Sequence, residues 1–171
     1  MEPIRAGVVT ISDKGYAGER EDVSGPLLAD RLGAMGIAVA HQRVIPDERD
    51  QIEATLIALV DEEGLDVVLT TGGTGATPRD VTPEATLAVI DREMSGIAEV
   101  LRLEGYRKTP SAVLSRGVSG LRGRALIINL PGSPGAVRDG MDILTDILPH
   151  AVQMARGEQT EHHHKEEDPH A

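Results

Sequence analysis

The sequence contains no cysteine, no tryptophan and no phenylalanine, and it has only two tyrosines, Tyr16 and Tyr106. Without cysteine the chain has no disulfide, no thiolate metal ligand and no catalytic thiol. With so few aromatic rings it lacks the stacking platform on which many proteins bind single-stranded nucleic acid. The hydrophobic core is therefore expected to consist of aliphatic side chains.

Basic residues are also scarce. The chain has 17 Lys and Arg residues against 28 Asp and Glu residues, which gives a net charge of −11. Such a chain is repelled by nucleic-acid phosphates and by anionic membrane surfaces, so we expect neither as a partner. No apolar run approaches the roughly 18 residues of a membrane span, and the N-terminal segment lacks the apolar stretch of a signal peptide. We therefore expect a cytoplasmic protein.

A length of 171 residues suits a single domain. The composition changes after Met154, because the remaining residues include no Leu, Ile or Val. We expect an α/β domain over residues 1–155 and an acidic, histidine-containing flexible tail over residues 156–171. The tail histidines permit two interpretations, a solvated segment or loose chelation of a transition metal. They are His162, His163, His164 and His170.

Short β-rich runs alternate with longer segments of helical periodicity along the domain. This pattern is typical of a parallel sheet covered by helices. Strands are expected over residues 4–11, 37–44, 66–71 and 125–130, with a weaker fifth over 112–114. Helices are expected to follow N-caps at Ser24, Asp47 and Thr82, the third reaching residue 91, and to cover residues 97–105 and 134–154, with an interruption near Pro149.

Each of the four stronger predicted strands is followed by a polar or glycine-rich loop. These loops comprise residues 12–15, 46–48, 70–75 and 131–135. In an open parallel sheet, ligands bind at the carboxyl ends of the strands, where the loops meet helix N-termini whose free amides attract anions. We therefore expect a ligand site where the four loops converge.

The loop after the third strand carries the densest signal. Gly72, Gly73 and Gly75 let the backbone turn sharply and approach a ligand closely, while Thr71 and Thr74 add hydroxyl groups. The pattern predicts a phosphate cradle, although the Gly-Lys-Ser/Thr ending of a P-loop is absent. Taken alone, the run is equally consistent with a tight strand-to-helix turn.

Two carboxylates are expected near this loop, those of Asp47 and Asp80. Together they are suited to Mg²⁺, which prefers carboxylate oxygens, keeps several waters and is usually completed by substrate phosphates. Helix capping is an equal alternative for Asp47, and an ion pair with Arg79 or another base is the alternative for Asp80. Lys14, Arg79 and Arg116 are candidates to balance anionic substrates, or else ordinary exposed bases.

Several ordered motifs resemble those of one family. Residues 70–75, followed by residues 79–85, resemble the signature of the Mog/MoaB-type molybdopterin-binding family of molybdenum cofactor synthesis, and in particular its Mog-type adenylyltransferases. The similarity continues through residues 11–13, 45–47, 91–94, 114–116 and 129–132, so that it covers the chain from Gly7 to about Gly157. The combination is far more specific than the glycine loop alone.

The resemblance implies an α/β three-layer sandwich, with a mostly parallel central sheet covered by helices on both faces. It also implies a nucleotidyltransferase that transfers AMP from Mg-ATP to the terminal phosphate of molybdopterin and releases pyrophosphate. ATP and molybdopterin would be substrates, Mg²⁺ the cofactor, a homotrimer the common assembly, and other proteins of molybdenum cofactor synthesis transient partners. A non-catalytic molybdopterin carrier of the same pathway is the alternative, and the presence of both Asp47 and Asp80 favours the enzyme.

The resemblance also implies the site residues. Asp47 and Asp80 correspond to the catalytic, metal-binding aspartates, and Ser115 corresponds to a serine of the pterin region. The positions expected to contact substrate or nucleotide are Ser12, Asp13, Thr71, Gly72, Gly73, Thr74, Gly75, Arg79, Ser115, Pro131, Gly132 and Ser133.

Overall fold

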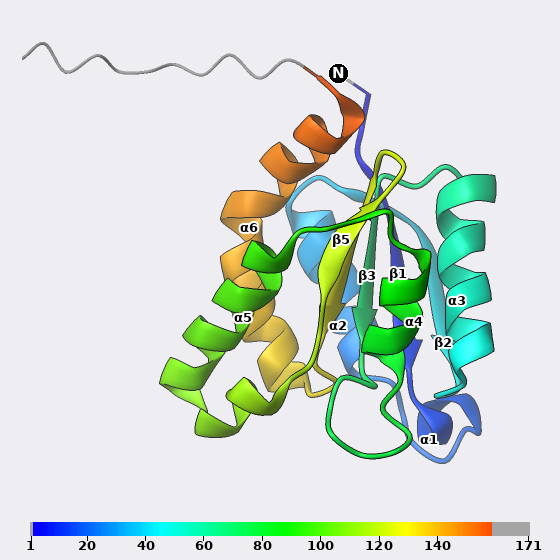
Figure 1. Cartoon of the computed structure of the whole chain (residues 1–171), viewed down its shortest axis with the longest axis vertical. Helices are drawn as coiled ribbons and strands as arrows, with labels where there is room; N and C mark the ends of the chain where they lie inside the picture. Colours follow the sequence, from blue (N-terminus) through cyan, green and yellow to red (C-terminus); the bar gives the residue numbers. More distant parts are fainter. Residues whose placement is uncertain (1, 159–171) are drawn as a thin grey trace, which may run out of the picture.

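The computed structural model describes residues 2–158, which form one six-stranded sheet between two layers of helices (Figure 1). The strands are β1 (Arg5–Ile11), β2 (Ala38–Ile45), β3 (Val67–Thr71), β4 (Arg92–Glu93), β5 (Ser119–Arg122) and β6 (Ala125–Leu130). Their order across the sheet is β2-β1-β3-β6-β5-β4. The first four in this order run parallel to one another, β5 runs antiparallel to β6, and β4 pairs antiparallel with β5. The predicted mostly parallel three-layer α/β fold is confirmed.

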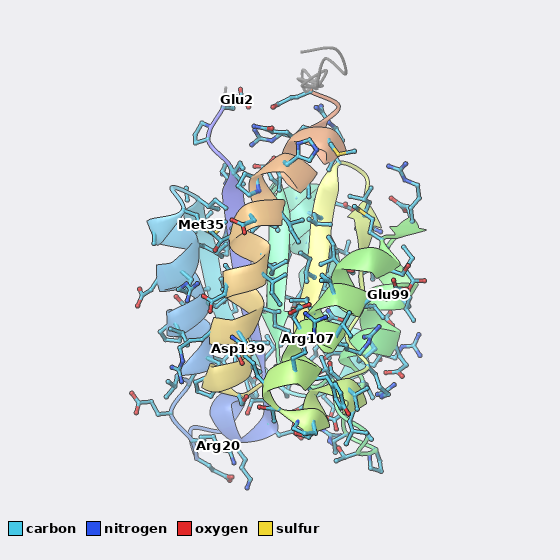
Figure 2. The ribbon with its side chains drawn as sticks, turned by 90° about the vertical axis from the view of Figure 1, so that its left-hand side faces the viewer. Glu2, Arg20, Met35, Glu99, Arg107 and Asp139 are labelled. Carbon is cyan, nitrogen blue, oxygen red and sulfur yellow. The ribbon has the colours of Figure 1, made fainter. Side chains whose placement is uncertain are left out.

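The helices divide between the two faces of the sheet. They are α1 (Asp13–Tyr16), α2 (Ser24–Ala34), α3 (Arg49–Ile57), which continues into a π-helical turn η1 (Ala58–Glu62), α4 (Thr82–Val89), α5 (Ser95–Lys108), the 3₁₀ helix η2 (Pro110–Leu114), and α6 (Pro134–Arg156). α2, α5 and α6 cover one face, with α6 between the other two (Figure 2), and α3 and α4 cover the opposite face. Aliphatic side chains fill both interfaces, as the composition predicts.

The strand register places the predicted loops side by side. β3 and β6 are buried along their whole length, because helices cover both faces of the sheet there. Ile11 at the end of β1 pairs with Ile45 at the end of β2, and Thr71 at the end of β3 pairs with Leu130 at the end of β6. The loops that follow these four strands therefore emerge at one edge of the sheet.

The prediction of a weaker fifth strand at residues 112–114 is wrong. These residues belong to η2, which starts at Pro110, and the apolar side chains of Val113 and Leu114 are exposed rather than part of the core. The remaining two strands, β4 and β5, were not expected. They are short, and β5 carries a single aliphatic residue, Leu121, so their sequences lack the apolar runs that predicted the other four.

The expected interruption near Pro149 is also wrong, because α6 runs without a break from Pro134 to Arg156. Proline removes one backbone hydrogen bond from a helix interior. Here Leu148, Ala151 and Val152 are buried on both sides of it, and their packing holds the two halves in one helix.

Three helix starts differ from the predicted caps. Ser24 and Thr82 are the first residues of α2 and α4 rather than their N-caps, and α4 ends at Val89. The N-cap of α3 is Glu48, so Asp47 is not a capping residue.

The side chains of all three predicted caps form hydrogen bonds elsewhere in the fold. Ser24 and Thr82 donate to the carbonyl oxygens of Gly132 and Gly72, and Asp47 accepts a hydrogen bond from the amide of Asp13.

The folded body extends past the predicted boundary at residue 155. Arg156 is the last residue of α6, and its side chain is only 8% exposed because it pairs with Asp66. The rest of the predicted tail, including its four histidines, lies in residues 159–171, outside the described residues. Among residues 2–158, no helix is both long and apolar enough to span a membrane.

Candidate active site

The glycine loop that follows β3 is packed tightly against its neighbours. Gly72 has a φ of +102°, and a Cβ atom there would lie 2.2 Å from the carbonyl oxygen of Ile11; at Gly73, with a φ of +66°, it would lie 2.2 Å from Oγ1 of Thr82. The Gly72 amide donates to the carbonyl of Leu130 at 3.0 Å. Glycine is therefore required at both positions, and the loop is fixed between β1, β6 and α4.

The two predicted carboxylates flank this loop. Oδ1 of Asp47 lies 3.1 Å from the position that a Cβ atom would take at Gly73, and Oδ2 of Asp80 lies 2.8 Å from that position at Gly75. Burial raises the pKa of Asp47, and the negative charges of Asp13 and Asp80 add to this effect although the Asp13 amide opposes it. The two carboxylates repel each other, and a cation between them would relieve that repulsion.

Asp80 belongs to a closed turn. Its Oδ2 accepts hydrogen bonds from the amide of Thr77 at 2.9 Å and from the hydroxyl of Thr77 at 2.7 Å, while its own amide donates to the Thr77 carbonyl at 3.0 Å. The alternative of an ion pair between Asp80 and Arg79 is wrong, because Arg79 pairs with Asp13 and Glu48 instead.

The loops after β1 and β2 form a connected polar network. Arg79 donates to both carboxylate oxygens of Asp13, from Nε at 3.1 Å and from Nη2 at 3.0 Å, and Nη2 also reaches Glu48 at 2.8 Å. These hydrogen bonds hold the pKa of Asp13 below its usual value. Ser12 caps α1 by accepting a hydrogen bond from the amide of Gly15 at 3.0 Å. Ser12, Asp13, Asp47 and Arg79 thus lie together beside the glycine loop.

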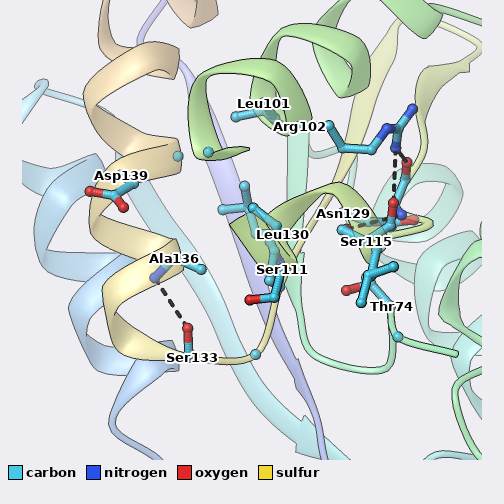
Figure 3. Close-up of a pocket in the computed structure, with 18 of the residues that line it drawn as sticks. Thr74, Leu101, Arg102, Ser111, Ser115, Asn129, Leu130, Ser133, Ala136 and Asp139 are labelled. Atoms are coloured by element: carbon cyan, nitrogen blue, oxygen red, sulfur yellow. Dashed lines mark hydrogen bonds between the residues drawn. The ribbon is translucent and has the colours of Figure 1, made fainter. Parts of the chain in front are cut away.

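A cavity of about 550 Å³ lies on the other side of the glycine loop (Figure 3). It is enclosed by the glycine loop, α5, η2 and the first turns of α6. The predicted site residues that line it are Gly72, Gly73, Thr74, Gly75, Asp80, Ser115, Pro131, Gly132 and Ser133. The structure therefore places the predicted residues in two groups, with the glycine loop shared between them and Asp80 on the cavity side.

The N-terminus of α6 faces this cavity. Ser133 caps the helix by accepting a hydrogen bond from the amide of Ala136 at 3.2 Å, and both Gly135 and Ala136 line the cavity. The first turn of a long helix carries free amides and partial positive charge, which favour an anionic ligand. This turn therefore provides a positive potential for an anionic ligand in a chain whose net charge is negative.

Thr71 contributes to the site indirectly. It is fully buried, and its hydroxyl donates to the carbonyl of Pro131 at 2.7 Å. The hydrogen bond ties the end of β3 to the loop after β6. Its hydroxyl is thus already used within the fold, whereas Thr74 lines the cavity.

Several residues that line the cavity were not predicted. They include Leu101, Arg102 and Gly105 from α5, Ser111 and Ala112 from η2, and Asp139 and Ile143 from α6. Those on α5 and α6 lie on helices without a recognisable motif, and those on η2 lie in a segment where a strand was expected. Their convergence depends on how α5 and α6 pack beside each other, and no local motif signals it.

The remaining candidate bases differ in their surroundings. Arg116 is exposed but donates to the carbonyls of Gly75 and Asp80 and pairs with Glu84. Lys14 is exposed in α1 and is not among the residues that line the cavity. Neither side chain reaches the cavity itself.

Comparison with known proteins adds independent evidence. Residues 7–150 match the family model described as a probable molybdopterin binding domain. The chain is 46% identical over 145 residues to the molybdopterin adenylyltransferase of Haemophilus influenzae, covering 84% of this chain and 74% of that one. It is 43% identical over 155 residues to the molybdenum cofactor synthesis protein cinnamon of Drosophila melanogaster, covering 90% of this chain but only 26% of that longer protein.

A solved structure shares both the fold and much of the sequence. The molybdopterin biosynthesis enzyme MoaB from Thermus thermophilus superposes with a TM-score of 0.86 at 48% identity, covering 91% of this chain and 98% of that one. The order of strands and helices described above is thus that of a known architecture.

Proposed function

The chain belongs to the molybdopterin-binding family, and from that premise we propose that it is a molybdopterin adenylyltransferase of molybdenum cofactor biosynthesis. In the proposed reaction, an oxygen of the terminal phosphate of molybdopterin attacks the α-phosphorus of ATP. A new P–O bond forms, the bond between the α-phosphorus and the α,β-bridging oxygen breaks, and pyrophosphate leaves with the bonding electron pair. The product is adenylated molybdopterin.

One observation carries this proposal. Asp47 and Asp80 flank a glycine loop of fixed shape, and this loop forms one wall of a cavity that is large enough for a small-molecule ligand. Transfer of a nucleotidyl group needs little covalent help from the protein, because positioning and neutralisation of phosphate charge account for most of the catalysis. Backbone amides of the loop and of the α6 N-terminus are suited to positioning the phosphates.

The two aspartates also fit a magnesium ion. Among residues 2–158 no three His, Asp or Glu side chains converge as a complete metal cage. Mg²⁺ does not need such a cage, since one or two carboxylates together with water and substrate phosphates complete its coordination. We propose that Asp47 and Asp80 hold this ion, which would neutralise charge on the phosphates when it is bound.

The two groups of site residues suggest a division of roles. We assign the cavity beside Ser115 and Ser133 to molybdopterin, and the loops carrying Ser12, Asp13 and Arg79 to ATP. The assignment is supported by the position of the glycine loop, which is shared by both groups. It would bring the two phosphate groups together at Asp80.

The family resemblance also bears on the cellular location, the assembly and the partners of the enzyme. Following the family resemblance, we propose a cytoplasmic homotrimer that contacts other proteins of molybdenum cofactor synthesis transiently. Sedimentation equilibrium of the purified chain tests the assembly.

The central experiment is to incubate the purified protein with Mg-ATP and molybdopterin and to search for adenylated molybdopterin by mass spectrometry. We expect the product with the unchanged protein and none with Asp80→Asn. Tight binding of molybdopterin without any transfer of AMP would show a carrier instead. A fully active Asp80→Asn variant would refute the role of this aspartate.

A further inference from the structure

One arginine outside the cavity holds together the two ends of the segment from Gly75 to Asp80, which follows the glycine loop. The backbone amide of Arg116 donates to the carbonyl of Thr74 at 2.8 Å, its Nε donates to the carbonyl of Gly75 at 2.8 Å, and its Nη2 donates to the carbonyl of Asp80 at 2.7 Å. A single residue thus bonds to both ends of the segment that carries Asp80.

The segment that carries Arg116 is itself held in place. From α5, Nη1 of Arg102 donates to the carbonyl of Gly117 at 2.7 Å, and Figure 3 shows Arg102 extending toward Ser115. From β6, Oδ1 of Asn129 accepts a hydrogen bond from the amide of Val118 at 3.1 Å. These contacts anchor residues on the C-terminal side of Arg116 to two rigid elements. The guanidinium group therefore connects an anchored segment to the glycine loop.

The charge of Arg116 is already balanced. Its guanidinium pairs with Glu84 of α4, and this hydrogen bond holds the pKa of Glu84 below its usual value. Three of its nitrogen atoms donate to protein oxygens, and the side chain does not line the cavity. Its contacts are those of a structural fork rather than of a phosphate ligand.

We propose that Arg116 is a positioning residue, which keeps residues 75–80 closed so that the Asp80 carboxylate stays beside Gly75 before substrates bind. Its effect on catalysis rests on the adenylyltransferase function proposed above. A loop that is already closed does not have to be ordered during binding, so less binding free energy is lost. Without the fork, substrate binding would have to close the loop.

Two conservative substitutions separate the fork from the charge. Arg116→Lys keeps a positive charge that can pair with Glu84, but one ammonium group cannot reproduce the planar, two-pronged contact with the carbonyls of Gly75 and Asp80. Glu84→Gln removes the negative partner and leaves the fork intact. Arg122→Ala is a matched control, because Arg122 also bonds to one carboxylate, Asp61, and to one carbonyl, that of Val89, at the opposite edge of the sheet.

The test measures amide hydrogen exchange at Thr77 and Asp80 by NMR in the ligand-free proteins, together with thermal stability and the Kd for Mg-ATP. In Arg116→Ala and Arg116→Lys we expect exchange at these amides to rise, and the Kd to increase, by about tenfold or more, since two charge-assisted hydrogen bonds are lost. Glu84→Gln and Arg122→Ala should change neither quantity by more than about twofold, as is usual for exposed ion pairs.

Two results would overturn the proposal. If Arg116→Lys exchanges and binds like the unchanged protein, charge alone is sufficient and the fork has no positioning role. If Arg122→Ala opens the loop equally, the effect is a general loss of stability. Failure of the unchanged protein to transfer AMP would overturn the proposed function alone, because exchange is measured without substrates.

Discussion

Asp13 and Asp47 each accept a hydrogen bond from the backbone amide of the other. The amide of Asp13 donates to Oδ2 of Asp47 at 2.8 Å, and the amide of Asp47 donates to Oδ1 of Asp13 at 3.0 Å. This reciprocal pair locks the loops after β1 and β2 together, and it occupies one oxygen of Asp47 while Oδ1 lies near Gly73. Asp13 therefore orients the carboxylate that we assign to the metal ion.

This relationship predicts the effect of Asp13→Ala. The substitution keeps the Asp13 amide that bonds to the Asp47 carboxylate, but it removes the acceptor for the Asp47 amide and the partner of Arg79. The loop that carries Asp47 is then held less firmly, so its carboxylate is positioned less precisely. We expect kcat/KM for AMP transfer to fall by about 10- to 100-fold, as is typical when a partner that orients a metal ligand is removed. Steady-state kinetics with varied Mg²⁺ measures the change.

The control for this prediction is Asp61→Ala. Asp61 also pairs with an arginine, Arg122, but it lies far from the site at the end of η1. Its removal should leave kcat/KM unaltered. Equal losses in both variants would contradict an orienting role for Asp13.

Gly72→Ala should destabilise the fold through a steric clash. The new Cβ atom would lie 2.2 Å from the carbonyl oxygen of Ile11, in addition to the strain of a φ of +102°. Gly18→Ala is the matched control, because Gly18 has a φ of +75° and nothing lies within 4 Å of the position that its methyl group would take. We expect Gly18→Ala to cost about 1 kcal/mol of unfolding free energy, and Gly72→Ala about 3 kcal/mol or more. Urea denaturation measures both, and equal values would show that the loop relaxes.

The cavity predicts a selective effect of Ala136→Leu. Ala136 lies in the first turn of α6 and lines the cavity, and Figure 3 shows it on the wall of α6 that faces Leu130. A leucine there would occupy space that we assign to the pterin, so we expect the Kd for molybdopterin to rise about tenfold or more through steric crowding. Arg138→Leu, at an exposed position of the same helix, should leave it unaltered. Calorimetric titration distinguishes the two, and unchanged binding by Ala136→Leu would place the pterin elsewhere.

The sequence was sufficient to predict most of the sheet and the end of the sheet at which the loops of the candidate site converge. β3 and β6 are apolar along their length because both faces are covered, and such runs are visible in the sequence. The glycine loop was predictable because a positive φ at Gly72 and Gly73 imposes a choice of residue. Both features depend on short stretches of neighbouring residues, and such stretches can be recognised in a sequence.

The cavity wall was not predictable for the opposite reason. Arg102 and Asp139 lie on separate helices, and only the packing of α5 beside α6 brings both to the cavity. Arg116 was a candidate to balance substrate charge, with an ordinary exposed base as the alternative. In the structure its guanidinium donates to two backbone carbonyls that lie more than 30 residues away along the chain. These contacts depend on how elements distant in the sequence pack together, and the identity of a single residue does not reveal that packing.

The ion pair between Asp66 and Arg156 makes the stability of the fold depend on pH. Burial alone would raise the pKa of Asp66, but hydrogen bonds from Arg156 and from the Arg5 amide outweigh it and hold the pKa below its usual value of 3.8. The folded state therefore binds a proton at Asp66 less readily than the unfolded state does. The stabilisation from this ion pair is complete above about pH 4 and is lost as the pH falls further through the folded pKa.

Asp66→Asn tests this link between charge and stability. It removes the carboxylate that bonds to two nitrogens of Arg156, a side chain only 8% exposed, and leaves Glu158 at 3.3 Å as the remaining carboxylate partner. We therefore expect a loss of about 3 kcal/mol of unfolding free energy at pH 7. Below pH 4 the difference from the unchanged protein should shrink, because protonation of Asp66 there removes the same charge. Asp142→Asn, which breaks the more exposed pair with Arg31, should cost under about 1 kcal/mol. A difference for Asp66→Asn that stays constant from pH 7 to pH 3 would show that shape, and not the charge of Asp66, holds the end of α6 to the sheet.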